Sequence, residues 1–182
     1  MTNAPALDGP IAAWHLEHEC FRRLLHRLQR EVDRFHGAER PNYELMYDIV
    51  SYLRDYGDLF HHPREDVAFA RLVQHCSEMK LPLARLEQEH RVIAQAGEAL
   101  QRHIEAILNG SMVLRSDVEV AAAMYLAYYS GHIAKEEDDV LTRAVLHLTP
   151  EDWKAVKDCA PGGSDALVRA AMPKRYQDLI AG

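Results

Sequence analysis

The chain has 182 residues, of which 48% are hydrophobic and 27% charged, and its formal net charge at pH 7 is −7. This length and apolar content suit one domain with its own core and room for a small appendage. The negative charge argues against nucleic acids and anionic membranes as the main partners.

The sequence carries no signal for export or membrane insertion. The first residues lack the basic start and apolar run of a signal peptide, and the longest apolar stretch, 121–129, is too short to span a bilayer. The cysteines, Cys20, Cys76 and Cys159, are widely spaced and odd in number, which does not suit a disulfide framework. We therefore expect a cytoplasmic protein.

The first predicted helix begins near Asp8 and Pro10 and ends at Gly37. Its apolar positions recur at alternating steps of three and four residues, as on the inner face of a bundle helix. His18 is the one polar residue on that face. The apolar positions are Ile11, Trp14, Phe21, Leu25, Leu28, Val32 and Phe35.

The second predicted helix opens at Pro41 and is interrupted by Pro63. A proline removes one backbone hydrogen bond, clashes with the preceding turn and disfavours helical angles at the residue before it. We therefore expect a kink at Pro63, which could aim both His61 and His62 inward. The inner face is drawn as Leu45, Ile49, Leu53, Gly57, His61, Glu65, Ala68 and Leu72.

The third predicted helix begins near Pro82 and stops at Asn109 and Gly110. Its inner face has the same alternation of three and four, and its single polar residue is again a histidine, His90. The apolar positions are Leu83, Leu86, Ile93, Gly97, Leu100, Ile104 and Ile107.

The fourth predicted helix starts at Ser116, which forms the sequence pattern of a capping box with Glu119. Tyr128 falls on its inner face, where it reads as a core residue whose hydroxyl could hydrogen-bond a metal-bound oxygen. The inner positions are Val118, Ala121, Tyr125, Tyr128, His132, Glu136 and Val140.

A short fifth helix is predicted from Thr149, and 164–171 suits one more. The resulting fold class is all-α, an antiparallel up-down four-helix bundle with a short C-terminal helical extension. We expect the bundle to occupy residues 1–148 and the extension, residues 149–182, to pack on or beside it.

Each long helix carries a histidine on its inner face, and two of them carry a glutamate one turn later. Burying unpaired polar groups and charges is costly, and a metal ion removes the cost because imidazoles and carboxylates become ligands. This inventory suits two ions with an open position. The predicted metal ligands are His18, His61, His62, Glu65, His90, His132 and Glu136.

Three ligand choices stay open at this point. His62 and His15 are each candidates for an additional ligand. Glu136 is favoured over Glu137, because an offset of four residues from His132 rotates by only ~40° on a regular helix and an offset of five by ~140°. A local widening of the helix would reverse that choice. The flanking acids Glu89, Glu137 and Asp138 suit either exposed charges or hydrogen-bond partners of ligating imidazoles.

The runs His18-Glu19, 60–66, Glu89-His90 and 132–137 resemble the bacterial hemerythrin-like (HHE cation-binding) domain, over about residues 10 to 147. The resemblance implies a four-helix bundle around a non-haem di-iron centre bridged by carboxylates and an oxo or hydroxo group. The positions that match its ligands are His18, His61, Glu65, His90, His132 and Glu136.

The chain departs from the oxygen-carrying hemerythrins at two ligand positions. Their third helix supplies two histidines spaced by four, and this chain has His90 but Ala94. Their fourth helix pairs histidine with aspartate five residues later, and here a glutamate lies at four and another at five. His62 is the candidate for the missing histidine. The departures leave reversible oxygen carriage unsettled.

The resemblance leaves three functions open. The first is a di-iron protein that binds or senses oxygen or a related diatomic or redox species. The second is turnover of peroxide or nitric oxide at the same centre, and the third is iron storage, delivery or iron-centre repair. We favour a metal- and oxygen-binding protein over a dedicated enzyme. Two iron ions are the expected cofactor, with zinc or another divalent ion as substitute, and a protein partner or homo-oligomer stays open.

Overall fold

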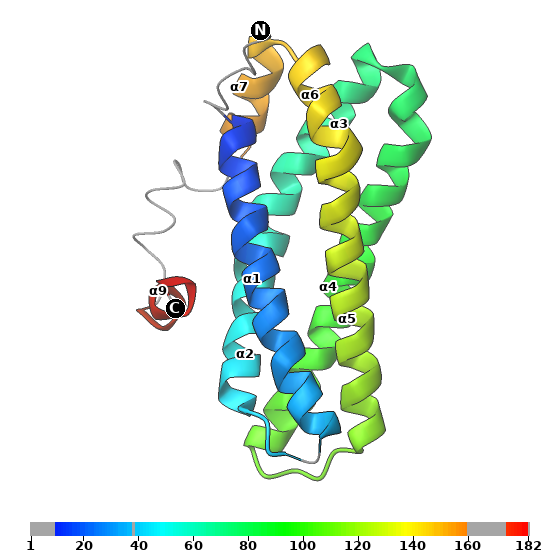
Figure 1. Cartoon of the computed structure of the whole chain (residues 1–182). Helices are drawn as coiled ribbons and strands as arrows, with labels where there is room; N and C mark the ends of the chain where they lie inside the picture. The colour runs from blue at the N-terminus through cyan, green and yellow to red at the C-terminus, as the bar shows by residue number, and fades with distance from the viewer. Residues whose placement is uncertain (1–9, 38, 160–173, 182) are drawn as a thin grey trace, which may run out of the picture.

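The structure is a computed structural model that describes residues 10–37, 39–159 and 174–181. Four long helices run up and down in turn (Figure 1), and we call them the first to fourth bundle helices. The first is α1 (Pro10–His36). The second joins α2 (Tyr43–Tyr52), the π-helix η1 (Leu53–His61) and α3 (His62–His75). After the 3₁₀ turn η2 (Ser77–Met79), the third is α4 (Lys80–Leu108). The fourth joins α5 (Arg115–Lys135), the π-helix η3 (Glu136–Val140) and α6 (Leu141–His147).

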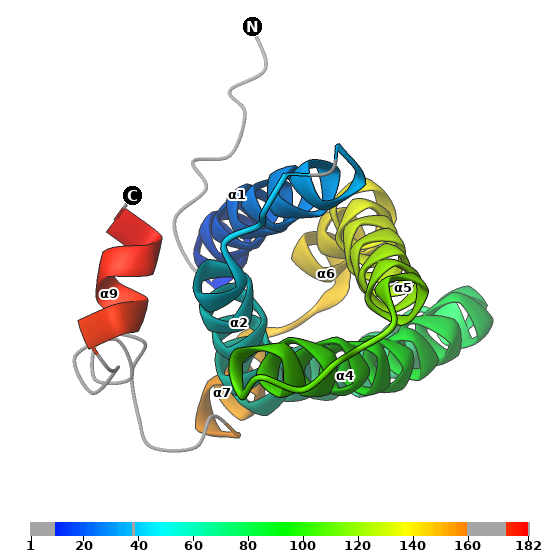
Figure 2. The same cartoon turned by 90° about the horizontal axis from the view of Figure 1, so that it is seen from below.

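The four bundle helices form a square in cross-section. Figure 2 shows α1 and α4 at opposite corners, and each of them contacts both α2 and α5. The all-α bundle expected from the inner-face patterns is therefore confirmed. Within the described residues, no helix combines the length and apolarity needed to cross a membrane.

The core consists of two apolar clusters with a polar layer between them. In α1, Trp14 belongs to one cluster, Phe21 to the other, and His18 lies between the two; in α4, Leu86 and Ile93 flank His90 in the same way. A fully buried Leu or Phe stabilises a fold by about 1.5–3 kcal/mol. A buried ion costs several kcal/mol unless it is compensated. The polar layer therefore indicates a function other than stability.

Pro63 does not break the second bundle helix, which stays helical from Tyr43 to His75. His62 keeps helical angles (φ −58°, ψ −39°), and Pro63 lies in the first turn of α3, so the expected distortion at His62 was wrong. The helix instead widens over the nine residues of η1, which ends two residues before the proline. The His62 N–H donates to the Gly57 carbonyl five residues earlier. A wider turn relieves the clash of the proline ring with the preceding turn. Both His61 and His62 are buried as a result.

The fourth bundle helix begins two residues earlier than a cap at Ser116 predicts. α5 starts at Arg115 after Leu114, which makes no side-chain cap. Ser116 therefore lies inside the helix, and Glu119 accepts a hydrogen bond from Arg115 at 2.8 Å instead of closing a capping box. The expected capping box at Ser116 was wrong.

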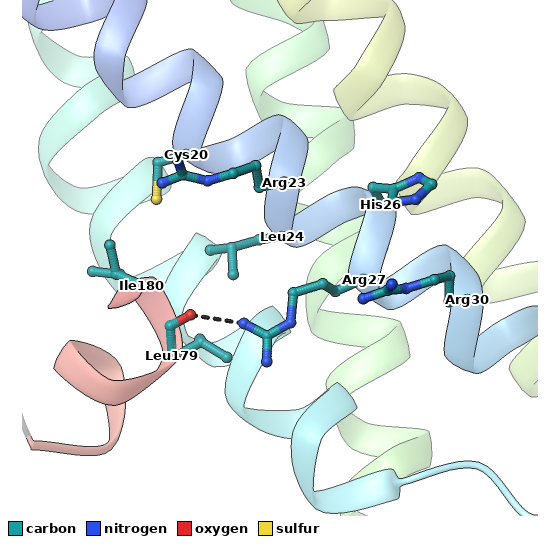
Figure 3. Close-up of a pocket in the computed structure, with 8 residues that line it drawn as sticks. All are labelled: Cys20, Arg23, Leu24, His26, Arg27, Arg30, Leu179 and Ile180. Atoms are coloured by element: carbon teal, nitrogen blue, oxygen red, sulfur yellow. Dashed lines mark hydrogen bonds between the residues drawn. The ribbon is translucent and has the colours of Figure 1, made fainter. Parts of the chain in front are cut away.

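Two C-terminal helices lie against the bundle. α7 (Pro150–Asp158) starts where the fifth helix was predicted, has a capping box made by Thr149 and Asp152, and contacts α3. α9 (Lys174–Ala181) contacts α2 and borders a cavity of about 210 Å³ on α1, where Arg27 donates to the Leu179 carbonyl at 2.8 Å (Figure 3). The predicted helix at 164–171 and the cap at Asp8 lie outside the described residues. We propose that bundle and extension divide at residues 148 and 149.

Candidate metal centre

Five imidazoles converge in the polar layer as two groups. His18 and His61 form the first group, with their Nε2 atoms 3.0 Å apart. His90 and His132 have their Nε2 atoms 2.9 Å apart, and the His62 ring stacks on His90 with centroids at 4.2 Å, which completes the second group. All five side chains are buried.

Two carboxylates lie between the groups. Oε1 of Glu65 is 2.9 Å from Nε2 of His61, and its Oε2 is 3.5 Å from Nε2 of His90. Oε2 of Glu136 is 3.5 Å from Nε2 of His18, and its Oε1 is 3.1 Å from Nε2 of His132. Each carboxylate thus presents one oxygen to each group, which is the arrangement that bridges two ions.

Several of these atoms are buried without a hydrogen-bond partner among the described residues. They are Nε2 of His62, Oε2 of Glu65 and both carboxylate oxygens of Glu136. These oxygens lie close to imidazole nitrogens, but the angles of the contacts are not those of hydrogen bonds, so the contacts show only that the atoms are close together. A buried polar atom without a partner calls for an unseen water or ion. The donor set therefore fits a metal pair.

Each inward imidazole is backed by a carboxylate at its other nitrogen. An Nδ1–H that donates outward leaves the Nε2 lone pair pointing inward, the tautomer that a metal ligand needs. The hydrogen-bonded pairs are His18 with Glu137 at 2.8 Å, His61 with Glu17, His90 with Asp66 at 2.8 Å, and His132 with Glu89 at 3.4 Å. Nδ1 of His62 lies 3.3 Å from Asp58 without the geometry of a hydrogen bond. The imidazoles are thereby oriented before any ion binds.

The electrostatics of the layer favour positive charge at its centre. Burial alone would lower the pKa of His18, but Glu137 and Glu65 outweigh it and raise that pKa to about 10. The pKa of His90 rises to about 11 because Asp66, Glu136 and Glu65 likewise outweigh burial. Although burial opposes it, His61 and His18 hold the pKa of Glu65 well below its usual range. In the metal-free protein, protons on these imidazoles balance the carboxylates.

The structure brings all seven predicted ligands into this one cluster. His62 joins the second group, whereas His15 remains outside both groups, is 32% exposed at its side chain and contacts Glu137. Glu136 is completely buried, and Glu137 lies behind His18. The π-helix η3 begins at Glu136, so the spacing from His132 to Glu136 stays that of an α-helix.

The buried tyrosine one turn before His132 is Tyr129, and not Tyr128 as the sequence pattern predicted. Tyr128 is 42% exposed, and Tyr129 is completely buried. The buried positions of α5 step from Tyr125 by four to Tyr129 and then by three to His132, whereas the sequence pattern was drawn with three and then four. Both phases fit a period of 3.6, so the pattern alone could not separate them.

Three of the carboxylates behind the imidazoles were missed from the sequence. Glu89, Glu137 and Asp138 were expected either as hydrogen-bond partners of the imidazoles or as exposed charges. Glu89 and Glu137 contact imidazoles, and Asp138 is exposed. The missed ones are Glu17, Asp58 and Asp66. Asp58 lies four residues before His62, a spacing that could have revealed it. The other two reach histidines on different helices.

Glu17 is the most deeply buried of these carboxylates. It accepts hydrogen bonds from Nδ1 of His61, from the Tyr56 hydroxyl at 3.0 Å and from Arg64 at 2.6 Å. Burial would raise its pKa, but His61 and Arg64 lower it to about 2. Glu17→Gln is expected to weaken metal binding about 10–100-fold, as for other outer-shell partners of ligating histidines. Chelator competition measures this.

The matched control is Glu19→Gln, because Glu19 is two residues away on the exposed face of α1. It should leave metal affinity at the wild-type value. Equal affinities for Glu17→Gln and wild type would mean that His61 needs no carboxylate to hold its orientation.

Comparison with known proteins agrees with this arrangement. The family model described as the hemerythrin HHE cation binding domain matches residues 9–144, a range that contains every residue of the cluster. Searches of curated proteins and of solved structures gave no match.

Proposed function

Since the chain belongs to the hemerythrin HHE cation-binding domain family, we propose that it is a non-haem di-iron protein that binds or senses oxygen or a related diatomic or redox species. The observation that carries the proposal is the cluster itself. Four buried imidazoles turn Nε2 toward two carboxylates, a fifth, that of His62, stacks on His90, and the oxygens of Glu136 have no hydrogen-bond partner among the described residues. Imidazoles and carboxylates are ligands that iron accepts, and zinc or another divalent ion can replace it.

The proposed ligand sets are unequal. One ion would have His18 and His61, the other would have His62, His90 and His132, and Glu65 and Glu136 would bridge them. When bound, a pair of iron ions supplies electrons and a Lewis-acidic position to a small ligand. The protein's part is to orient the imidazoles and exclude bulk water.

Turnover of peroxide or nitric oxide at the same centre is the second candidate. The buried hydroxyl of Tyr129 favours it, because a hydrogen-bond donor suits a polar ligand. Iron delivery has less support, since every proposed ligand is at most 7% exposed and release would require the bundle to open. Free thiols at all three cysteines support the inference of a cytoplasmic location.

The proposal predicts about two metal ions per chain, and iron after anaerobic loading. Elemental analysis of the purified protein gives the count. Air titration of the reduced protein then separates the roles: a reversible optical change supports oxygen binding, net consumption of the ligand supports turnover, and loss of iron to a chelator supports delivery. A content below half an ion per chain after anaerobic loading would refute the metal site.

A further inference from the structure

A buried hydroxyl that is not one of the proposed metal ligands lies beside the cluster. Tyr129 is completely buried, and its hydroxyl oxygen has no hydrogen-bond partner among the described residues. Buried hydroxyls in folded proteins almost always have a partner, so one that lacks it points to a water or ligand that occupies the site in the working protein. The question is what lies within reach of this hydroxyl.

Tyr129 approaches the imidazoles from the side opposite the two central carboxylates. Glu65 and Glu136 each follow a histidine of the cluster by one turn, whereas Tyr129 precedes His132 by about one turn. The second and fourth bundle helices run in the same direction (Figure 1), so both carboxylates lie on one side of the imidazoles and Tyr129 on the other. Its ring centroid is 5.7 Å from that of His62.

Gly57 leaves the space that the hydroxyl occupies. A Cβ atom at Gly57 would lie 2.5 Å from the Tyr129 oxygen and 3.9 Å from Cε1 of His62. The hydroxyl therefore lies between the widened turn of η1 and an imidazole of the second group. Any side chain at position 57 would displace it.

The hydroxyl is a hydrogen-bond donor, because an ordinary tyrosine titrates at about pH 10 and is protonated at neutral pH. A protonated phenol in an apolar wall, with Phe21 at 5.9 Å between ring centroids, can donate one strong hydrogen bond to a negative acceptor.

We propose that Tyr129 is a ligand-binding residue of the metal pair, and that its hydroxyl donates a hydrogen bond to a small anionic ligand on the face opposite Glu65 and Glu136. The ligands selected in this way are inorganic species with a charged acceptor atom, such as azide or hydroperoxide. The inference rests on the proposed function, because it needs the metal pair to hold the ligand.

Azide titration of the oxidised iron-loaded protein tests the inference. Tyr129→Phe should keep about two iron ions per chain and raise the azide Kd about 10-fold or more, the effect of losing a hydrogen bond to a charged acceptor. The azide stretching frequency should shift between H₂O and D₂O in the wild type, and the shift should vanish in Tyr129→Phe. Tyr125→Phe is the matched control, because Tyr125 is equally buried one turn farther from His132; its azide Kd should stay within about twofold of wild type.

Gly57→Ala gives a second test that leaves Tyr129 and the ligands unchanged. The added methyl displaces the hydroxyl, so azide binding should weaken as in Tyr129→Phe and the melting temperature should fall. In the double variant Gly57→Ala/Tyr129→Phe, the hydroxyl is gone and the methyl has room. Its melting temperature should therefore recover, while its azide binding should stay weak. If Tyr129→Phe does not retain iron, the azide Kd of Gly57→Ala decides.

The outcomes separate this inference from the proposed function. Wild-type protein without a metal pair overturns both. An intact pair whose azide Kd and D₂O shift are the same in wild type, Tyr129→Phe and Gly57→Ala overturns the role of Tyr129 and leaves the di-iron proposal standing.

Discussion

Glu136→Gln is expected to lose at least one of two metal ions per chain, and Glu137→Gln is expected to keep both. Glu136 is fully buried, with one oxygen 3.5 Å from His18 Nε2 and the other 3.1 Å from His132 Nε2. Changing it to an amide removes the negative charge that the two proposed ions would share, so the loss of affinity should exceed ~100-fold. Glu137 accepts the Nδ1–H of His18, also contacts His15 and Arg22, and is not a proposed ligand, so its loss should cost about 10–100-fold.

Elemental analysis and the charge-transfer band of the oxidised protein measure both variants. Asp138→Asn is the control, since Asp138 is the next acidic residue along the chain and is exposed. If Glu137→Gln lost the centre and Glu136→Gln kept it, the widening in η3 would have to begin earlier than Glu136.

Removing the metal is expected to lower the melting temperature by about 8–16 °C for each site that is lost. An ion at about a thousand times its Kd stabilises the native state by about 4 kcal/mol. For a chain of this size, 1 kcal/mol corresponds to about 2–4 °C. Scanning calorimetry of chelated and reloaded protein gives the difference. Identical melting temperatures would place the metal away from the buried cluster.

The difference between loaded and metal-free protein should depend on pH. In the metal-free protein the pKa values of His18 and His90 lie above the unfolded value, at about 10 and 11. Their contribution to stability is complete below pH ~6.5 and is lost as the pH rises through the folded pKa values. Bound metal replaces these protons, so the melting temperatures should move apart between pH 7 and 9. In acid the ligands protonate, metal leaves and the difference closes.

Local periodicity was sufficient to predict the bundle and to bring most of the cluster together. His18 and His90 are single polar residues on otherwise apolar faces. The apolar faces of bundle helices turn toward the core, so both histidines were expected to be buried there. The pairs His61–Glu65 and His132–Glu136 share a face because four residues make about one turn. These features depend only on spacing within one helix.

What the sequence could not predict depends on contacts between helices or on backbone widening. Glu17 and Asp66 reach imidazoles on other helices, and no spacing within one helix encodes such a contact. Pro63 predicted a distortion of the second bundle helix but not its form, since a kink and a π-helix both relieve the same clash. The burial of Tyr129 instead of Tyr128 likewise depends on how α5 is rotated in the bundle.

The charge of the carboxylates around the imidazoles also affects how the oxidation state of a bound metal pair would be coupled to anion binding. Glu17, Glu65 and Glu136 are at most 2% exposed, and Arg64 is the buried cation that faces Glu17. When the imidazoles are neutral, as metal ligands are, the interior has an excess of two negative charges. Two divalent ions would turn this into an excess of two positive charges, and the four acids behind the imidazoles at its edge would offset that excess in part. Two trivalent ions would add two more positive charges to the same interior, where charge is poorly screened. The oxidised centre should therefore hold anions more tightly than the reduced one, and by linkage anions should lower its reduction potential.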